Sequence, residues 1–134
     1  MRKIVITESD HLNLNTLLES EFAKVVGPSI RFDELKRELQ RAEIVSRDEI
    51  SNDVVAMNSK VVLRDLETGE RETYTLVFPV DADIAEGRLS VLAPIGTAIL
   101  GEHVGDKIRW RVPSGWRRLK IEEIIPEDAE VGAA

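Results

Sequence analysis

The sequence predicts an α+β protein in which two amphipathic helices come first and a strand-rich segment follows. Within the first 45 residues, apolar positions recur every three or four residues, which is the period of a helix. After residue 57 the apolar positions alternate with polar ones, and turn residues separate the runs, which is typical of antiparallel strands. With 134 residues, the chain can form one compact domain and a small second part.

The first helix is expected to begin after Thr7, because Thr7-Glu8-Ser9-Asp10 fits the pattern of a capping box. One face of this helix would carry Leu14, Leu18, Phe22 and Val25. Gly27-Pro28-Ser29 would end it, since proline cannot continue a helix. A second helix would carry Phe32, Leu35, Leu39 and Ala42 on one face. Residues 1–45 therefore predict an antiparallel helical hairpin whose first helix is roughly 25 Å long.

Residues 46–56 are expected to form a linker with a short helical turn. Ser46 and Glu49 have the spacing of a helix start, but Ser51-Asn52-Asp53 interrupts it. Two strands, Lys60–Asp65 and Arg71–Phe78, would then form a hairpin around the turn Leu66–Gly69. An acidic loop over 80–87 and a short strand over 88–92 would follow Pro79.

A last hairpin is predicted from Lys107–Val112, the turn Pro113-Ser114-Gly115 and the strand Trp116–Ile125. Alternation along these strands sends one set of side chains inward: Ile108, Trp110, Val112, Leu119 and Ile121. The other face would carry the basic panel, defined here as Lys107, Arg109, Arg111, Arg118 and Lys120. Trp116 could be a core residue or an interface anchor. Residues 57–126 are thus expected to form the strand-rich domain, and 127–134 a loose acidic tail.

Charge is distributed unevenly along the chain. The net charge is -7, so the protein as a whole should repel nucleic acid and anionic membranes, and no sequence-specific nucleic-acid binding is expected. Between Gly105 and Lys120, however, six basic residues stand against Asp106 as the one acid. The basic panel could dock a partner, or its charges could blunt an exposed sheet face and edge.

The sequence carries no pattern typical of a catalytic, metal or cofactor site. It contains no cysteine, and His11 and His103 lack metal-ligand spacing. It also lacks the nucleophile elbow and the glycine-rich phosphate loops. We therefore expect a protein that is not an enzyme and that holds no metal or cofactor. Asp33 and Glu34 lie near the start of the second helix and so near the expected hairpin tip, where they would favour the helix dipole or be presented to a metal or a basic partner.

A cytoplasmic location is expected. No apolar run approaches the roughly 18 residues of a membrane span. The start, MRKIVITESD, lacks the apolar region and cleavage site of a secretory signal.

The run LSVLAPIGTAILGEHVGDKI, Leu89–Ile108, resembles the C-terminal domain of the Gre transcript-cleavage factors. There a serine-proline loop precedes a short helix, and a glycine-aspartate turn follows it. The stretches Asp53–Leu66 and Glu34–Ala42 look closer still to the family of regulators of nucleoside diphosphate kinase, within the Gre superfamily. The resemblance covers nearly the whole chain.

This resemblance implies a fold and a partner. The fold would be a short antiparallel coiled-coil hairpin followed by an FKBP-like antiparallel sheet wrapped around a short helix. The partner would be RNA polymerase, bound by a monomer at the rim of its secondary channel. The positions that match the Gre docking loop are Leu92, Ala93, Pro94 and Ile95. Alanine at position 93 departs from the Gre serine, so a serine-dependent contact is in doubt.

The expected hairpin is about half the Gre length, so Asp33 and Glu34 should stop short of the polymerase active centre. The resemblance therefore implies docking without stimulation of transcript cleavage, in competition with longer channel factors. An active cleavage factor and a peptidyl-prolyl isomerase or chaperone-like domain are the alternatives. Any effect on nucleoside diphosphate kinase is expected to be indirect, through transcription.

Overall fold

The computed structural model describes residues 4–19, 30–112 and 115–125, and divides the chain into two compact units, residues 1–51 and 52–134. The division falls inside the segment predicted to be a linker. Val54 and Val55, which the sequence assigns to that linker, are buried residues of the second unit. The outer boundaries of the expected domains stay predictions. No helix in the described ranges is long and apolar enough to cross a membrane.

Helix α1, Glu8–Leu18, begins where the sequence predicts. Thr7 is its N-cap, and its hydroxyl accepts a hydrogen bond from the Asp10 amide at 3.2 Å. This bond satisfies one of the amides that the first turn of a helix leaves unpaired. Leu14 is fully buried. The later members of the expected apolar face, Phe22 and Val25, lie outside the described residues.

Helix α3, Ile30–Arg41, runs back along α1, and Leu35 and Leu39 are buried as expected. The Nε2 of His11, near the start of α1, donates to the Leu39 carbonyl at 3.0 Å, near the end of α3. The two helices are therefore antiparallel. Their coiled-coil character stays a prediction, and the predicted break at 27–29 lies outside the described residues.

Two short strands that the sequence did not predict join the ends of these helices. Strand β1, Val5–Thr7, pairs in parallel with strand β2, Glu43–Val45, with Ile6 opposite Ile44. The Glu43 amide adds a hydrogen bond to the Ile4 carbonyl at 2.8 Å. Each strand has three residues, which is too short to show an alternating pattern. The pair ties the residues before α1 to those after α3.

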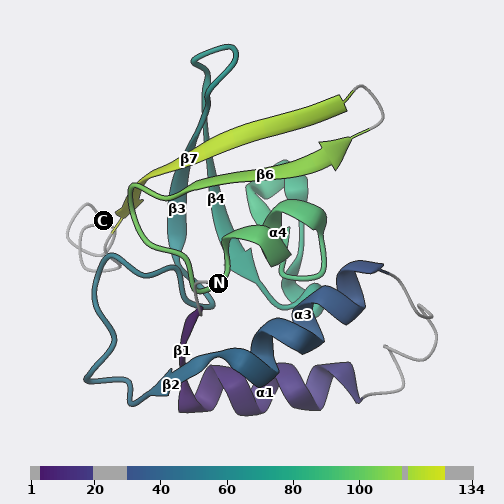
Figure 1. Ribbon diagram of the computed structural model, residues 1–134, viewed down its shortest axis with the longest axis vertical. Helices are drawn as coiled ribbons and strands as arrows, with labels where there is room; N and C mark the ends of the chain where they lie inside the picture. The colour runs from purple at the N-terminus through teal and green to yellow at the C-terminus, as the bar shows by residue number, and fades with distance from the viewer. Residues whose placement is uncertain (1–3, 20–29, 113–114, 126–134) are drawn as a thin grey trace. The chain divides into compact units, whose positions relative to one another are not determined.

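The second unit contains a five-stranded sheet in the order β5-β4-β3-β7-β6 (Figure 1). Its strands are β3 (Lys60–Asp65), β4 (Arg71–Val77), β5 (Arg88–Ser90), β6 (Lys107–Val112) and β7 (Gly115–Ile125). Both predicted hairpins are present, β3 with β4 and β6 with β7. The inner face buries apolar side chains from three strands: Val61, Leu63, Leu76, Leu119 and Ile121.

The sheet is mixed, which corrects the prediction of an antiparallel sheet. Strand β5 pairs in parallel with β4, with Leu76 opposite Leu89. Parallel neighbours need a crossover between them. The acidic loop supplies it through two 3-10 turns, η1 (Pro79–Asp81) and η2 (Ile84–Glu86). These turns carry the chain back, so that Arg88 at the start of β5 lies opposite Thr75 of β4.

The short helix α4, Pro94–Ile99, follows β5 and packs beside β6 (Figure 1). Ile99 and Leu100 are fully buried. Gly101 then takes a φ of 76°, a left-handed conformation that glycine adopts without strain, and ends the helix. A mixed α+β fold with a five-stranded sheet, a two-stranded sheet and few helices is thus confirmed, whereas its FKBP-like detail stays a prediction.

Candidate partner-binding surfaces

The docking loop, residues 92–95, is held in one conformation by its neighbours. The Ser90 hydroxyl accepts a hydrogen bond from the Leu92 amide at 3.1 Å, and the Ser90 carbonyl accepts one from the Ala93 amide at 3.0 Å. The Thr97 hydroxyl donates to the Val91 carbonyl at 2.7 Å. Leu92, Ala93 and Ile95 are half-buried. The loop therefore presents apolar side chains on a fixed backbone.

Pro94 occupies the first position of α4, where its fixed φ suits a helix start and its missing amide hydrogen is not needed. Ala93 is the N-cap and has no side-chain hydrogen bond. A serine there could cap the helix, and alanine cannot. The predicted departure from the Gre pattern thus falls on the N-cap of α4.

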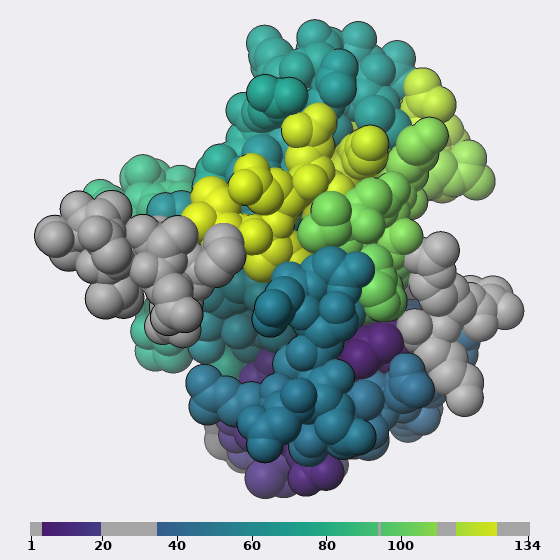
Figure 2. All heavy atoms as spheres, turned by 90° about the vertical axis from the view of Figure 1, so that its left-hand side faces the viewer, coloured from purple at the N-terminus to yellow at the C-terminus, as the bar shows by residue number. Residues whose placement is uncertain are grey.

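The basic panel occupies the face of β6 and β7 that alternation predicts. Lys107 lies directly opposite Lys120, and Arg109 opposite Arg118, while Ile108 pairs with the buried Leu119. Lys107, Arg109 and Arg118 are exposed. Like charges directly opposite each other on neighbouring strands are destabilising. In Figure 2, β6 in green and the later residues of β7 in yellow lie side by side at the surface. The side chain of Arg111 lies outside the described part.

Trp116 belongs to the same face as the basic panel. Its side chain is 56% exposed, so the structure excludes the core position that the sequence left open. The guanidinium carbon of Arg109 lies 4.8 Å from the centre of the Trp116 ring, which is a cation–π contact. This contact joins an exposed aromatic ring to the charged surface.

Two further arginines extend this face, and sequence reasoning missed them. Arg64 lies opposite both Lys120 and Arg71, so β3 and β4 each add a cation. A bulge in the pairing of β3 with β7 lies beside Glu122. The Glu122 carboxylate is 3.4 Å from Nη1 of Arg64 and 3.1 Å from Nε of Arg71. Alternation along 60–65 could have revealed Arg64, whereas the bulge has no sequence signal.

The remaining cations of the face differ in their partners. Arg118 is paired with Glu67, with 2.8 Å between Nη2 and Oε1. Within the residues that the structure describes, Lys107, Arg109 and Lys120 form no ion pair with an acid. The net positive charge of the face is therefore centred on β6 and the middle of β7.

A polar cluster lies on the opposite, inner face of the sheet. One oxygen of the buried Asp65 accepts hydrogen bonds from the amides of Glu67, at 2.7 Å, and Thr68, at 3.1 Å. Its other oxygen accepts from Nε of Arg117 at 3.0 Å. These two amides first, and then Arg117, lower the pKa of Asp65. Asp65 therefore fixes the β3–β4 turn and ties it to β7, which is a structural role.

Glu72 extends this cluster, since its carboxylate lies 3.5 Å from Nη2 of Arg117, and Tyr74 reports on Glu72. Tyr74 is the one tyrosine of the chain, so its ionisation can be followed directly. Its hydroxyl donates to Glu72, and burial, followed by this hydrogen bond, raises the pKa of Tyr74 to about 12. Titrating tyrosinate absorbance should therefore show ionisation near pH 12 in the folded protein. Because the neutral form is favoured, its contribution to stability is lost between about pH 10 and pH 12. The denatured protein is the control, and ionisation of the folded protein near pH 10 would contradict the structure.

The candidate residues for metal and acid–base chemistry are divided between the two units, with His103 in the second and the others in the first. Asp33 and Glu34 are the fourth and fifth residues of α3, and their side chains lie outside the described part. The His11 ring is hydrogen-bonded to the Leu39 carbonyl and to the Asn15 side chain. Nδ1 of His103 lies 3.8 Å from Oδ2 of Asp106. Among the described residues, no group of three or more metal-binding side chains is found.

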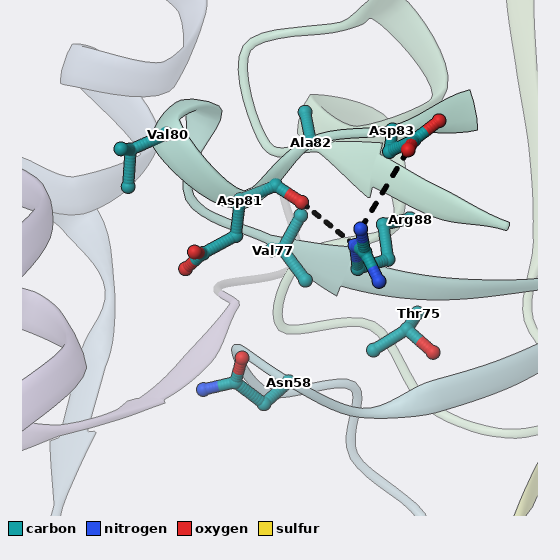
Figure 3. A pocket seen from close by; sticks show the side chains of 8 residues that line it. All are labelled: Asn58, Thr75, Val77, Val80, Asp81, Ala82, Asp83 and Arg88. Carbon is teal, nitrogen blue, oxygen red and sulfur yellow. Dashed lines mark hydrogen bonds and ion pairs between the residues drawn. The ribbon is translucent and has the colours of Figure 1, made fainter. Parts of the chain in front are cut away.

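A pocket in the second unit lies between β4, β5 and the acidic loop (Figure 3). Arg88 crosses it, donating to the Asp81 carbonyl at 2.9 Å and lying 3.7 Å from the Asp83 carboxylate. The pocket is lined by Asn58, Thr75, Val77, Val80, Asp81, Ala82, Asp83 and Arg88. None of these residues is aromatic, and none belongs to the docking loop or the basic panel.

The fold and the matched segment define the class of this protein. Residues 50–126, which include the sheet, α4 and the docking loop, match the family described as transcription elongation factor, GreA/GreB, C-terminal. The chain therefore belongs to the GreA/GreB family, and the predicted resemblance is confirmed.

Two relatives match most of this chain. The chain is 42% identical over 112 residues to the regulator of nucleoside diphosphate kinase of Escherichia coli strain K12, covering 84% of this chain and 80% of that protein. It is 35% identical over 116 residues to the transcription elongation factor GreA of Syntrophobacter fumaroxidans, covering 85% and 74%.

Two solved structures are similar to this chain. The transcription elongation factor GreA/GreB from Nitrosomonas europaea superposes with a TM-score of 0.77 at 40% identity, covering 92% of this chain and all of that one. GreA factor homolog 1 of Thermus thermophilus superposes with a TM-score of 0.50 at 25% identity, covering 93% of this chain and all of that one.

Proposed function

We propose that this chain is a non-enzymatic regulator of transcription in the bacterial cytoplasm. It binds RNA polymerase as a monomer at the rim of the secondary channel and competes there with Gre-type factors. It does not stimulate transcript cleavage. Membership of the GreA/GreB family and the names of the relatives as elongation factors support a role in transcription.

The docking loop is the observation that carries this proposal. Its apolar side chains lie on a backbone fixed by Ser90 and Thr97, so little conformational entropy would be lost when a partner covers them. It also falls within the segment that matches the family. We assign the contact with the polymerase rim to Leu92, Ala93, Pro94 and Ile95.

The length of α3 supports docking without cleavage. Asp33 precedes the end of α3 at Arg41 by eight positions, which corresponds to roughly 12 Å along the helix axis. If the hairpin points into the channel, acids near its tip would therefore still lie only roughly 12 Å beyond its base. The contribution of Asp33 and Glu34 is then to helix stability and solubility, not to metal binding.

The described pocket does not support the isomerase alternative. Binding a proline side chain in a prolyl isomerase requires an aromatic-lined pocket, and the eight residues that line this one include no aromatic side chain. Control of nucleoside diphosphate kinase would be indirect under the proposal. A stable complex of the two purified proteins without polymerase would contradict that part.

Replacing Ile95 by aspartate should weaken binding to core RNA polymerase by about tenfold or more, because a charge would be desolvated within an apolar contact. Ile84→Asp is the matched control, since Ile84 is 64% exposed on the acidic loop of the same unit. Fluorescence anisotropy of labelled protein measures both, and an unlabelled Gre factor should displace the wild type. Equal affinities for the two variants would remove the docking loop from the interface.

The same complexes allow the cleavage activity to be measured. Added to backtracked elongation complexes, the protein should leave the transcript length unchanged and should inhibit shortening by a Gre factor. Shortening that disappears in an Asp33→Ala, Glu34→Ala double variant would instead establish an active cleavage factor.

A further inference from the structure

We infer that the outer face of the β6–β7 hairpin is a second docking surface, which takes an acidic polypeptide segment of the same partner and uses Trp116 as its apolar anchor. The inference rests on the proposed function, because it names the chemistry of a further contact with the polymerase. This surface is distinct from the docking loop, which lies at the start of α4.

A row of cations across three strands is the first argument. Lys107 of β6, Lys120 of β7 and Arg64 of β3 lie directly opposite one another in the strand register. Of these three, only Arg64 has an acidic partner, Glu122, among the described residues. Such a row is unfavourable in the isolated protein, since like charges repel. Carboxylates from a partner would attract these cations and so offset their mutual repulsion.

The second argument is the position of Trp116 beside these cations. Tryptophan and arginine are enriched at the energetic centres of protein interfaces, where the aromatic ring supplies apolar area and the guanidinium supplies directed hydrogen bonds. The cation–π contact with Arg109 already orders the ring, so its loss of freedom on binding is small. An acidic segment with an apolar residue next to its carboxylates would complement this arrangement.

The charge pattern favours a polypeptide over a nucleic acid. A nucleic-acid groove follows a long phosphate backbone with continuous positive charge. Here Glu67 and Glu122 interrupt the face: Glu67 is paired with Arg118, and Glu122 is shared by Arg64 and Arg71. The net charge of -7 adds long-range repulsion of a polyanion. A short segment with a few carboxylates can bind the unneutralised cations without meeting those acids.

The decisive variant is Lys120→Glu, because its expected effects on stability and on binding have opposite signs. A glutamate at position 120 would lie opposite both Lys107 and Arg64, so folding should be as stable as in the wild type or more stable. Binding to core polymerase should nevertheless fall by about tenfold. Arg47→Glu is the matched control, since it makes the same charge change at an exposed residue outside α3, the docking loop and the sheet.

Trp116→Ala separates the anchor from the charges. It should also weaken polymerase binding by about tenfold, and the wild-type affinity should fall with rising salt more steeply than that of Lys120→Glu. Two labelled probes identify the chemistry of the partner: a short peptide of glutamates around a single leucine, and a single-stranded RNA of matching charge. We expect the peptide to bind, and to bind more weakly to both variants.

The outcomes distinguish this inference from the proposed function. If the wild type binds polymerase and Lys120→Glu binds equally well, the second surface is wrong and the docking loop is unaffected. If the wild type does not bind polymerase, the proposed function fails, and peptide binding that Lys120→Glu abolishes still establishes the surface. RNA binding as tight as peptide binding, or tighter, would overturn the choice of an acidic polypeptide.

Discussion

Replacing Gly96 by alanine should destabilise the second unit by about 3 kcal/mol. A Cβ atom at position 96 would lie 2.1 Å from the Ser90 carbonyl oxygen and 3.0 Å from the Val91 Cα, both of which are backbone atoms. Relief would require α4 to move away from the end of β5. The same change in an unconstrained helix would be favourable by about 1 kcal/mol, so the expected sign is the reverse of helix propensity.

Denaturant unfolding followed by tryptophan fluorescence measures this effect. Both tryptophans, Trp110 and Trp116, belong to the second unit, so the signal reports on that unit. Gly69→Ala is the control, because nothing lies within 4 Å of its Cβ position and only its φ of 77° opposes the change. If Gly96→Ala were as stable as the wild type, α4 would not be packed on Ser90 as described. Since Ser90 also holds the docking loop, the proposed function predicts that polymerase binding falls together with stability.

Replacing Asp65 by alanine is expected to have the next largest effect. It removes the acceptor of two turn amides and the partner of Arg117 in one step. Removing one member of a hydrogen-bonded group leaves the others unsatisfied, which costs more than the bond itself contributes. We expect the Tm to fall by roughly 5 to 10 °C. Glu67→Ala removes the exposed pair with Arg118 and should leave the Tm nearly unchanged.

The charge of Asp65 should also make stability depend on pH. Its pKa is lowered in the folded state, so its contribution is complete above the pKa of the unfolded chain and is lost as the pH falls through the lower folded value. Below about pH 4 the wild type should therefore lose stability faster than Asp65→Asn, which keeps its acceptor oxygen but does not titrate. Parallel pH profiles for the two proteins would show that the carboxylate is not favoured in its charged form.

The sequence was most informative where a pattern extends over several turns or alternations. The spacing of Leu14, Leu35 and Leu39 located the packed face of the two helices, and the alternation around Leu119 and Ile121 assigned the basic panel to its face. Thr7 was recognised as a helix cap from its hydroxyl and the acids that follow it.

What the sequence did not reveal depends on contacts between distant segments. The pairing of β1 with β2 involves three residues on each side, and the parallel direction of β5 depends on the path of the crossover before it. Asp65 and Arg117 are far apart in the sequence, and no local pattern indicates their ion pair. The position of Trp116 beside Arg109 required the register of the last hairpin, which its turn residues alone do not fix.

Because β1 pairs with β2 at one end of the two helices, the length of the helices can change without changing how that end is held. These strands join the helical unit where α1 begins and α3 ends, so the opposite ends of the two helices take no part in that joint. Whole turns could be added or removed at those opposite ends while the joint keeps its register. Under the proposed function, hairpin length could then vary among family members without changing the attachment, so that a short and a long member would reach different depths of RNA polymerase.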